Sequence, residues 1–105
     1  PEYMAPEQLD GDAASPAVDV YALGVILYQL LTGRVPLQGA TPADTMRLAL
    51  REEPVPPRRL QPAVPRDLET VCLKCLEKEP GRRYSSAEAL ADDLDRWASN
   101  EPILA

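Results

Sequence analysis

Cys72 and Cys75 are the two residues whose spacing most directly suggests chemistry, because C-x-x-C occurs in zinc sites and in redox motifs. A zinc site needs about four ligands, and the chain has no histidine and no second cysteine pair. The pair also lies inside a helical pattern, on an apolar face with Leu68 and Leu76. We therefore expect no metal site, but two reduced thiols packed in a core, which indicates a reducing, cytoplasmic setting.

Asp19 is the other residue that stands out, because it is a carboxylate in the first turn of the most apolar helix of the chain. Its negative charge could interact favourably with the helix dipole, or its oxygens could cap free backbone N–H groups. It could instead accept hydrogen bonds from a neighbouring backbone held in an unusual conformation. Taken alone, the first interpretation is favoured.

No other set of residues suggests chemistry. The sequence contains no Gly-rich phosphate loop and no serine placed beside a base. The 105 residues allow one domain with a modest core, and a net charge of −6 without a basic run argues against nucleic acid. No signal-like or membrane-spanning segment is present, and a start at Pro1 suggests a piece of a longer protein.

Helical periodicity accounts for nearly the whole chain, and no strand-like alternation is visible, so the expected fold class is all-α with about four main helices. After a short turn and loop at 1–14, residues 15–33 are apolar on all sides and predict a buried central helix, capped by Ser15 and ended by Gly33. Further helices are expected at 41–53, 65–79 and 85–99, with a non-helical connection between the first two of these. In the last helix, Ser85 and Glu88 have capping-box spacing. Its outward residues are expected to be Asp92, Asp93, Asp95 and Arg96.

Three segments of the chain are informative in the order in which they occur: Tyr3–Glu7, Asp19–Val25 and Pro80–Tyr84. Together they resemble the protein kinase family. Tyr3-Met4-Ala5-Pro6-Glu7 is similar to the Ala-Pro-Glu end of the activation segment. The stretch Asp19–Val25, DVYALGV, resembles the D-x-W/Y-x-x-G start of the family's central helix, and Pro80–Tyr84, PGRRY, resembles the P-x-x-R loop before its last helix. The resemblance covers essentially the whole chain but only the last part of a kinase domain, so 1–105 is expected to be a partial domain from the C-terminal lobe.

The resemblance implies roles for particular residues. Glu7 would form a structural ion pair with Arg83, and Asp19 would anchor the backbone of the catalytic loop. The helix at 41–53 would lie on the peptide-docking side. The residues expected to shape the substrate pocket are Pro1, Glu2, Tyr3 and Met4.

The resemblance also implies a function, because Tyr3 stands where tyrosine kinases usually carry Trp and the chain's end is similar to bacterial serine/threonine kinases. The intact protein would transfer the ATP γ-phosphoryl group to Ser or Thr of a protein substrate, using ATP and Mg²⁺. The family's ATP-binding and catalytic motifs precede the Ala-Pro-Glu motif, so the chain alone is expected to bind neither cofactor and to be inactive. The alternative is a non-catalytic, pseudokinase-like interaction module. We further expect no direct membrane contact and self-association of the isolated chain through uncovered apolar faces.

Overall fold

The computed structural model describes residues 2–10 and 14–105, and these residues form only helices, turns and loops. The α-helices are α1 (Pro16–Thr32), α2 (Pro42–Arg51), α3 (Pro57–Leu60), α4 (Arg66–Cys75) and α5 (Ala87–Ala98). Two 3₁₀ turns, η1 (Pro6–Asp10) and η2 (Pro80–Arg82), complete the order. The all-α prediction is confirmed. No helix among the described residues is long and apolar enough to cross a bilayer.

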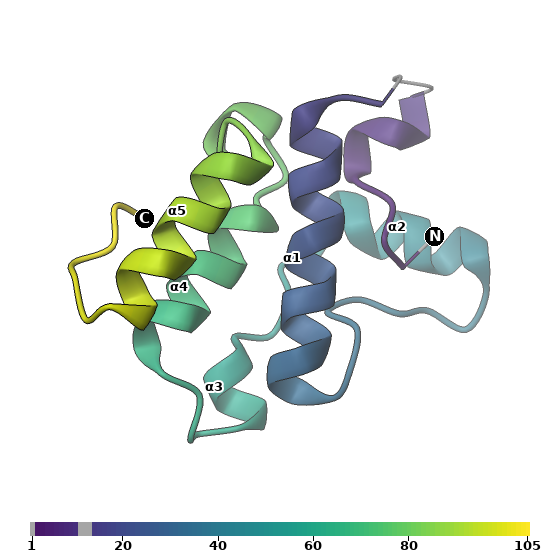
Figure 1. Ribbon diagram of the computed structural model, residues 1–105. Helices are drawn as coiled ribbons and strands as arrows, with labels where there is room; N and C mark the ends of the chain where they lie inside the picture. The colour runs from purple at the N-terminus through teal and green to yellow at the C-terminus, as the bar shows by residue number, and fades with distance from the viewer. Residues whose placement is uncertain (1, 11–13) are drawn as a thin grey trace.

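Helix α1 runs through the middle of the molecule, with α4 and α5 on one side and η1 and α2 on the other (Figure 1). The Ser15 hydroxyl accepts the Val18 N–H at 3.2 Å and caps its start, and Pro16 occupies its first turn. At its other end Gly33 takes a left-handed conformation, with φ 80°, and donates its N–H to the Gln29 carbonyl. The capping signals in the sequence therefore lie at the true ends of the helix.

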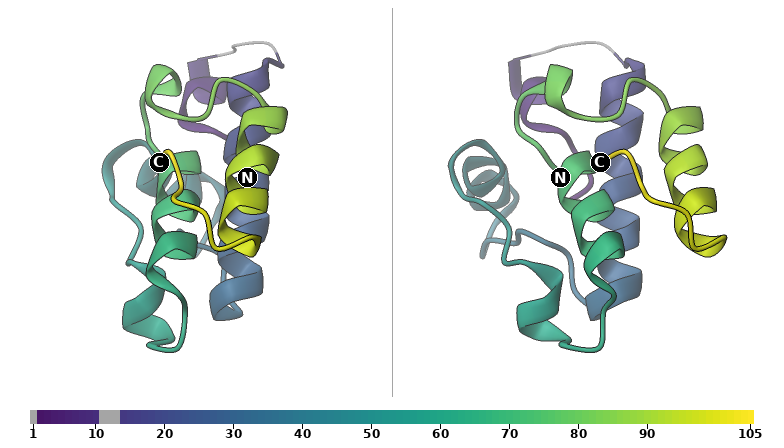
Figure 2. Two further views of the ribbon diagram at one scale, coloured as in Figure 1. Left: turned by 60° about the vertical axis from the view of Figure 1, so that its left-hand side comes forward. Right: turned by 90° about the vertical axis from the view of Figure 1, so that its left-hand side faces the viewer.

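The core consists of two clusters of buried side chains that both involve α1 and α4. In the first cluster, side chains of α1 and α4 meet Ala5; its members are Ala5, Val18, Tyr21, Val25, Tyr28, Cys72 and Leu76. In the second, α1 and α4 meet α5 and Tyr84, which lies in the segment between η2 and α5; its members are Val20, Val71, Cys75, Tyr84 and Leu90. Both views of Figure 2 show α1 and α4 side by side. Their contact is the structural centre of the chain.

The expectation that α1 is buried on all sides is wrong for one face. Leu23, Ile26 and Leu30 are 38%, 45% and 78% exposed. They line an open apolar groove of about 260 Å³ between α1 and α5, together with Leu27, Ala87, Leu90, Ala91 and Leu94. This face is apolar but uncovered in the described chain.

Three predicted boundaries also differ from the structure. The connection after α2 contains the short helix α3, whose first residue, Pro57, has a φ suited to that position. Helix α4 ends at Cys75 rather than at 79. Ser86, not Ser85, caps α5, because its hydroxyl accepts the Ala89 N–H at 3.0 Å. A capping box needs Glu or Gln three residues after the cap. Glu88 is only two residues after Ser86, so no capping box forms.

Candidate functional site

Arg83 is the most highly bonded side chain of the structure described here, and it follows directly on η2. Its side chain is fully buried. Nε donates to the Glu77 carbonyl at 2.7 Å, and Nη1 and Nη2 donate to the carbonyls of Ala17 at 3.1 Å and Lys78 at 3.2 Å. The same two Nη atoms donate to the Glu7 carboxylate. All five guanidinium donor positions are thereby used.

Glu7 lies in η1, and the structure brings its carboxylate onto Arg83 with both oxygens. Arg83 Nη1 lies 2.6 Å from Oε2, and Nη2 lies 2.8 Å from Oε1. Such a two-pronged arrangement is among the strongest hydrogen-bonded pairs in proteins. The hydrogen bonds from Arg83 hold the pKa of Glu7 below its ordinary value, although partial burial opposes the shift. The Arg83 guanidinium also lies over the Tyr21 ring, 5.0 Å from its centroid.

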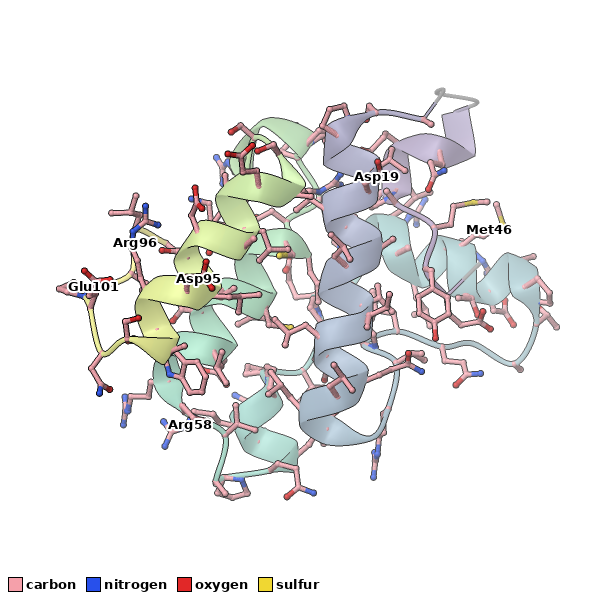
Figure 3. The ribbon with its side chains drawn as sticks, viewed as in Figure 1. Asp19, Met46, Arg58, Asp95, Arg96 and Glu101 are labelled. Carbon is pink, nitrogen blue, oxygen red and sulfur yellow. The ribbon has the colours of Figure 1, made fainter. Side chains whose placement is uncertain are left out.

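Asp19 lies apart from this pair, in the first turn of α1 (Figure 3). Its side chain is exposed, and no hydrogen bond or ion pair joins it to another residue that the structure describes. It caps nothing at the helix start, because Ser15 does so. The geometry therefore does not support the interpretation that Asp19 caps the start of α1.

The predicted substrate-pocket residues lie at the start of the described chain, except that Pro1 falls outside the described residues. Tyr3 is 42% exposed, and its hydroxyl donates a hydrogen bond to the Gln29 side chain of α1. Glu2 and Tyr3 line an open cavity of about 620 Å³ with Gln29, Gly33, Arg34, Val35 and Gln38. Met4 is half-buried and does not line it.

A comparison with protein families matches residues 1–94 to the protein kinase domain. The chain belongs to this family. Over 101 residues, this kinase-domain segment is 40% identical to the serine/threonine-protein kinase PknB of Mycobacterium leprae and to that of Mycobacterium tuberculosis strain H37Rv. It is 38% identical over 92 residues to the serine/threonine-protein kinase PrkC of Bacillus subtilis. These alignments cover 96%, 96% and 88% of the chain but 16%, 16% and 14% of the relatives, so the chain spans about one sixth of their length.

The part of this kinase-domain segment that the structure describes contains no group of three or more His, Cys, Asp or Glu side chains placed to hold a metal ion. Cys72 and Cys75 are fully buried free thiols, and burial raises the pKa of each to about 12. These thiols are core residues.

Sequence reasoning missed the role of Asp93, which was expected to face out. Its side chain is fully buried, and it accepts the Tyr84 hydroxyl at 2.6 Å and Arg96 Nη1 at 3.0 Å. Burial raises its pKa, but the hydrogen bonds that it accepts outweigh this effect and leave the pKa below its ordinary value. One signal was available: Asp93 is three residues after Leu90, on the edge of the inward face.

Lys78 lies between α4 and η2. The structure shows its ammonium donating to the Ala49 carbonyl in α2 at 2.9 Å. It therefore connects the loop after α4 to the last turns of α2. The burial that accompanies this contact lowers the pKa of Lys78. No local signal marks such a long-range contact.

Proposed function

We propose that this chain is the C-terminal-lobe part of a serine/threonine protein kinase that transfers the ATP γ-phosphoryl group to Ser or Thr of protein substrates. The observation that carries the proposal is the two-pronged Glu7–Arg83 pair, which attaches the Ala-Pro-Glu segment to the loop before α5. The names of the PknB and PrkC relatives support the Ser/Thr class. ATP and Mg²⁺ belong, in this proposal, to the intact kinase and to residues outside this chain.

Asp19 is the proposed anchor of the catalytic loop. A carboxylate that is exposed and without a bonded partner among the described residues is free to accept hydrogen bonds from a backbone brought against it. Its place in the first turn of α1 makes it rigid, because α1 is held by both core clusters. A fixed acceptor of this kind orients a loop rather than reacting itself.

Residues 1–4 are proposed to shape the site for the protein substrate. The support is the hydrogen bond from Tyr3 to Gln29, which fixes the Tyr3 ring at the edge of the 620 Å³ cavity. Helix α2 lies next to η1 and is proposed to be the peptide-docking side of the lobe. The two reduced thiols support a cytoplasmic setting.

The test compares the intact kinase, this chain alone, and Asp19→Asn in the intact kinase, with transfer of labelled γ-phosphate to a protein acceptor as the readout. We expect transfer by the intact kinase and none by the chain alone. Asp19→Asn should lower kcat about a hundredfold, because a small misplacement of catalytic groups has that effect. Glu88→Gln is the matched control, since Glu88 is an exposed acid in the first turn of α5. A folded intact protein without transfer would contradict the proposal.

The second candidate is a non-catalytic interaction module, and the open apolar groove favours it. Its lining is almost wholly aliphatic, and Leu30 is 78% exposed. Uncovered apolar surface of this kind is typical of interaction sites. We propose that in the isolated chain this groove drives self-association. If the intact protein folds but transfers no phosphate, this candidate replaces the first.

A further inference from the structure

The chain reverses direction after α5 and returns along it. Ser99 and Asn100 end the helix, and Asn100 has a left-handed conformation with φ 57°. The Glu101 N–H then donates to the Arg96 carbonyl at 2.8 Å, which closes the turn. Residues 101–105 run back toward the N-terminal end of α5, as Figures 1 and 2 show. We call residues 101–105 the strap.

The strap is bonded to Asp93 through its main chain. The Leu104 N–H donates to Oδ1 at 2.8 Å, and the Ala105 N–H donates to Oδ2 at 3.1 Å. With Tyr84 and Arg96, the carboxylate has four donors, two on each oxygen. A buried carboxylate is very unfavourable unless such donors surround it. Half of the donors that satisfy Asp93 therefore come from the strap.

Apolar packing and a cavity accompany these hydrogen bonds. Ile103 is half-buried and packs against the second core cluster, as Leu94 and Ala89 also do. Leu104 is 73% exposed but forms part of the wall of a cavity of about 340 Å³, with Lys74, Ser85, Asp93 and Arg96 among its other lining residues. The strap is thus held by one apolar side chain and by two backbone amides, not by the side chain of Leu104.

We infer that Asp93 is a docking site for the main chain of the strap, and that this docking sets the path of the polypeptide as it leaves the last helix. Because the site recognises two successive N–H groups, it tolerates different side chains at 104 and 105 but not proline. Pro102 is compatible, because no bond to its nitrogen is needed. This inference does not depend on the proposed kinase activity.

Hydrogen–deuterium exchange in the intact kinase tests the inference, with peptides covering residues 99–105 as the readout. Asp93→Asn removes the charge that holds both amides, so exchange of the strap should accelerate roughly tenfold or more. Asp92→Asn is the matched control, because Asp92 is the exposed neighbour on the same helix. Equal strap exchange in the two variants, with α5 still protected, would overturn the inference.

A second pair of variants leaves Asp93 unchanged and covers the case in which Asp93→Asn unfolds α5. Leu104→Pro removes one of the two recognised N–H groups, whereas Leu104→Ala removes only an exposed side chain. We expect the Ala105 amide to exchange roughly tenfold faster in Leu104→Pro and at the wild-type rate in Leu104→Ala. If both variants keep the wild-type rate, main-chain docking on Asp93 is refuted.

Discussion

Gly24 on α1 and Cys75 on α4 lie so close that a Cβ atom on Gly24 would be 2.4 Å from the Cβ of Cys75. Real Cβ atoms do not approach this closely. The same added atom would lie 3.2 Å from a methyl group of Leu76. The contact between α1 and α4, which both core clusters share, therefore requires a glycine at position 24.

Gly24→Ala should consequently destabilise the chain although alanine is the better helix former. Overpacking costs typically about 1–3 kcal/mol, while the gain in helix propensity is about 1 kcal/mol. We expect a net loss in the free energy of unfolding of about 1–2 kcal/mol, measured by urea denaturation. Gly81→Ala is the control, because nothing lies within 4 Å of a Cβ there. Equal stability of the two variants would contradict the proposed helix contact.

Arg83→Met should unfold the chain or come close to doing so. It leaves the largely buried Glu7 carboxylate without its partner. For a buried pair this lowers the free energy of unfolding by about 3–5 kcal/mol. Arg82→Met, at the exposed neighbouring arginine, should change stability by less than about 0.5 kcal/mol. Thermal unfolding followed by circular dichroism distinguishes the two. In a Glu7→Gln, Arg83→Met double variant, the loss in the free energy of unfolding should be smaller than the sum of the losses in the two single variants.

The stability of the chain should depend on pH through Glu7. Because Arg83 holds the folded-state pKa of Glu7 below its ordinary value of 4.5, the pair contributes fully at pH values above about 4.5. The contribution is lost as the pH falls through the lowered pKa. The difference in unfolding free energy between wild type and Glu7→Gln should therefore shrink below pH 4.5. Asp93, whose pKa is also lowered, titrates equally in both proteins and cancels in this difference.

Cys72 and Cys75 should resist alkylation in the folded chain. A pKa of about 12 lowers the thiolate fraction at pH 8 roughly a thousandfold relative to a free cysteine, and both side chains are fully buried. The rate of reaction with iodoacetamide should thus report unfolding, and both thiols should react rapidly in guanidinium chloride. Rapid labelling of the folded chain would contradict their place in the core.

Leu30→Glu should reduce self-association of the isolated chain. Leu30 is 78% exposed in the groove, so the substitution adds a charge to the apolar surface while costing less than about 0.5 kcal/mol. Sedimentation equilibrium gives the association constant. Leu50→Glu, at a 46% exposed leucine of α2 outside the groove, is the matched control. A wild-type chain that stays monomeric at all concentrations would show that the groove does not drive association.

Local signals predicted the parts of the fold that depend on neighbouring residues. Ser15 and Gly33 lie at helix ends because their capping interactions span at most four residues. Asp93 was expected to face out, because its partners at Tyr84 and in the strap are fixed only by tertiary packing. The contact between Lys78 and Ala49 depends on tertiary packing in the same way. The apolar sequence of α1 did not reveal which face stays open, since that depends on what packs against it. Glu7 and Arg83 were paired through the kinase resemblance, not through any local pattern.

The Glu7–Arg83 pair also has a consequence for the order of events during synthesis. The two residues are 76 positions apart, so a ribosome adding about 5–20 residues per second delivers Arg83 roughly 4–15 s after Glu7. Throughout this interval the Glu7 carboxylate lacks the Arg83 guanidinium that it binds in the folded structure. The nascent chain therefore cannot form this link between its Ala-Pro-Glu segment and the loop before α5 until Arg83 has been synthesised.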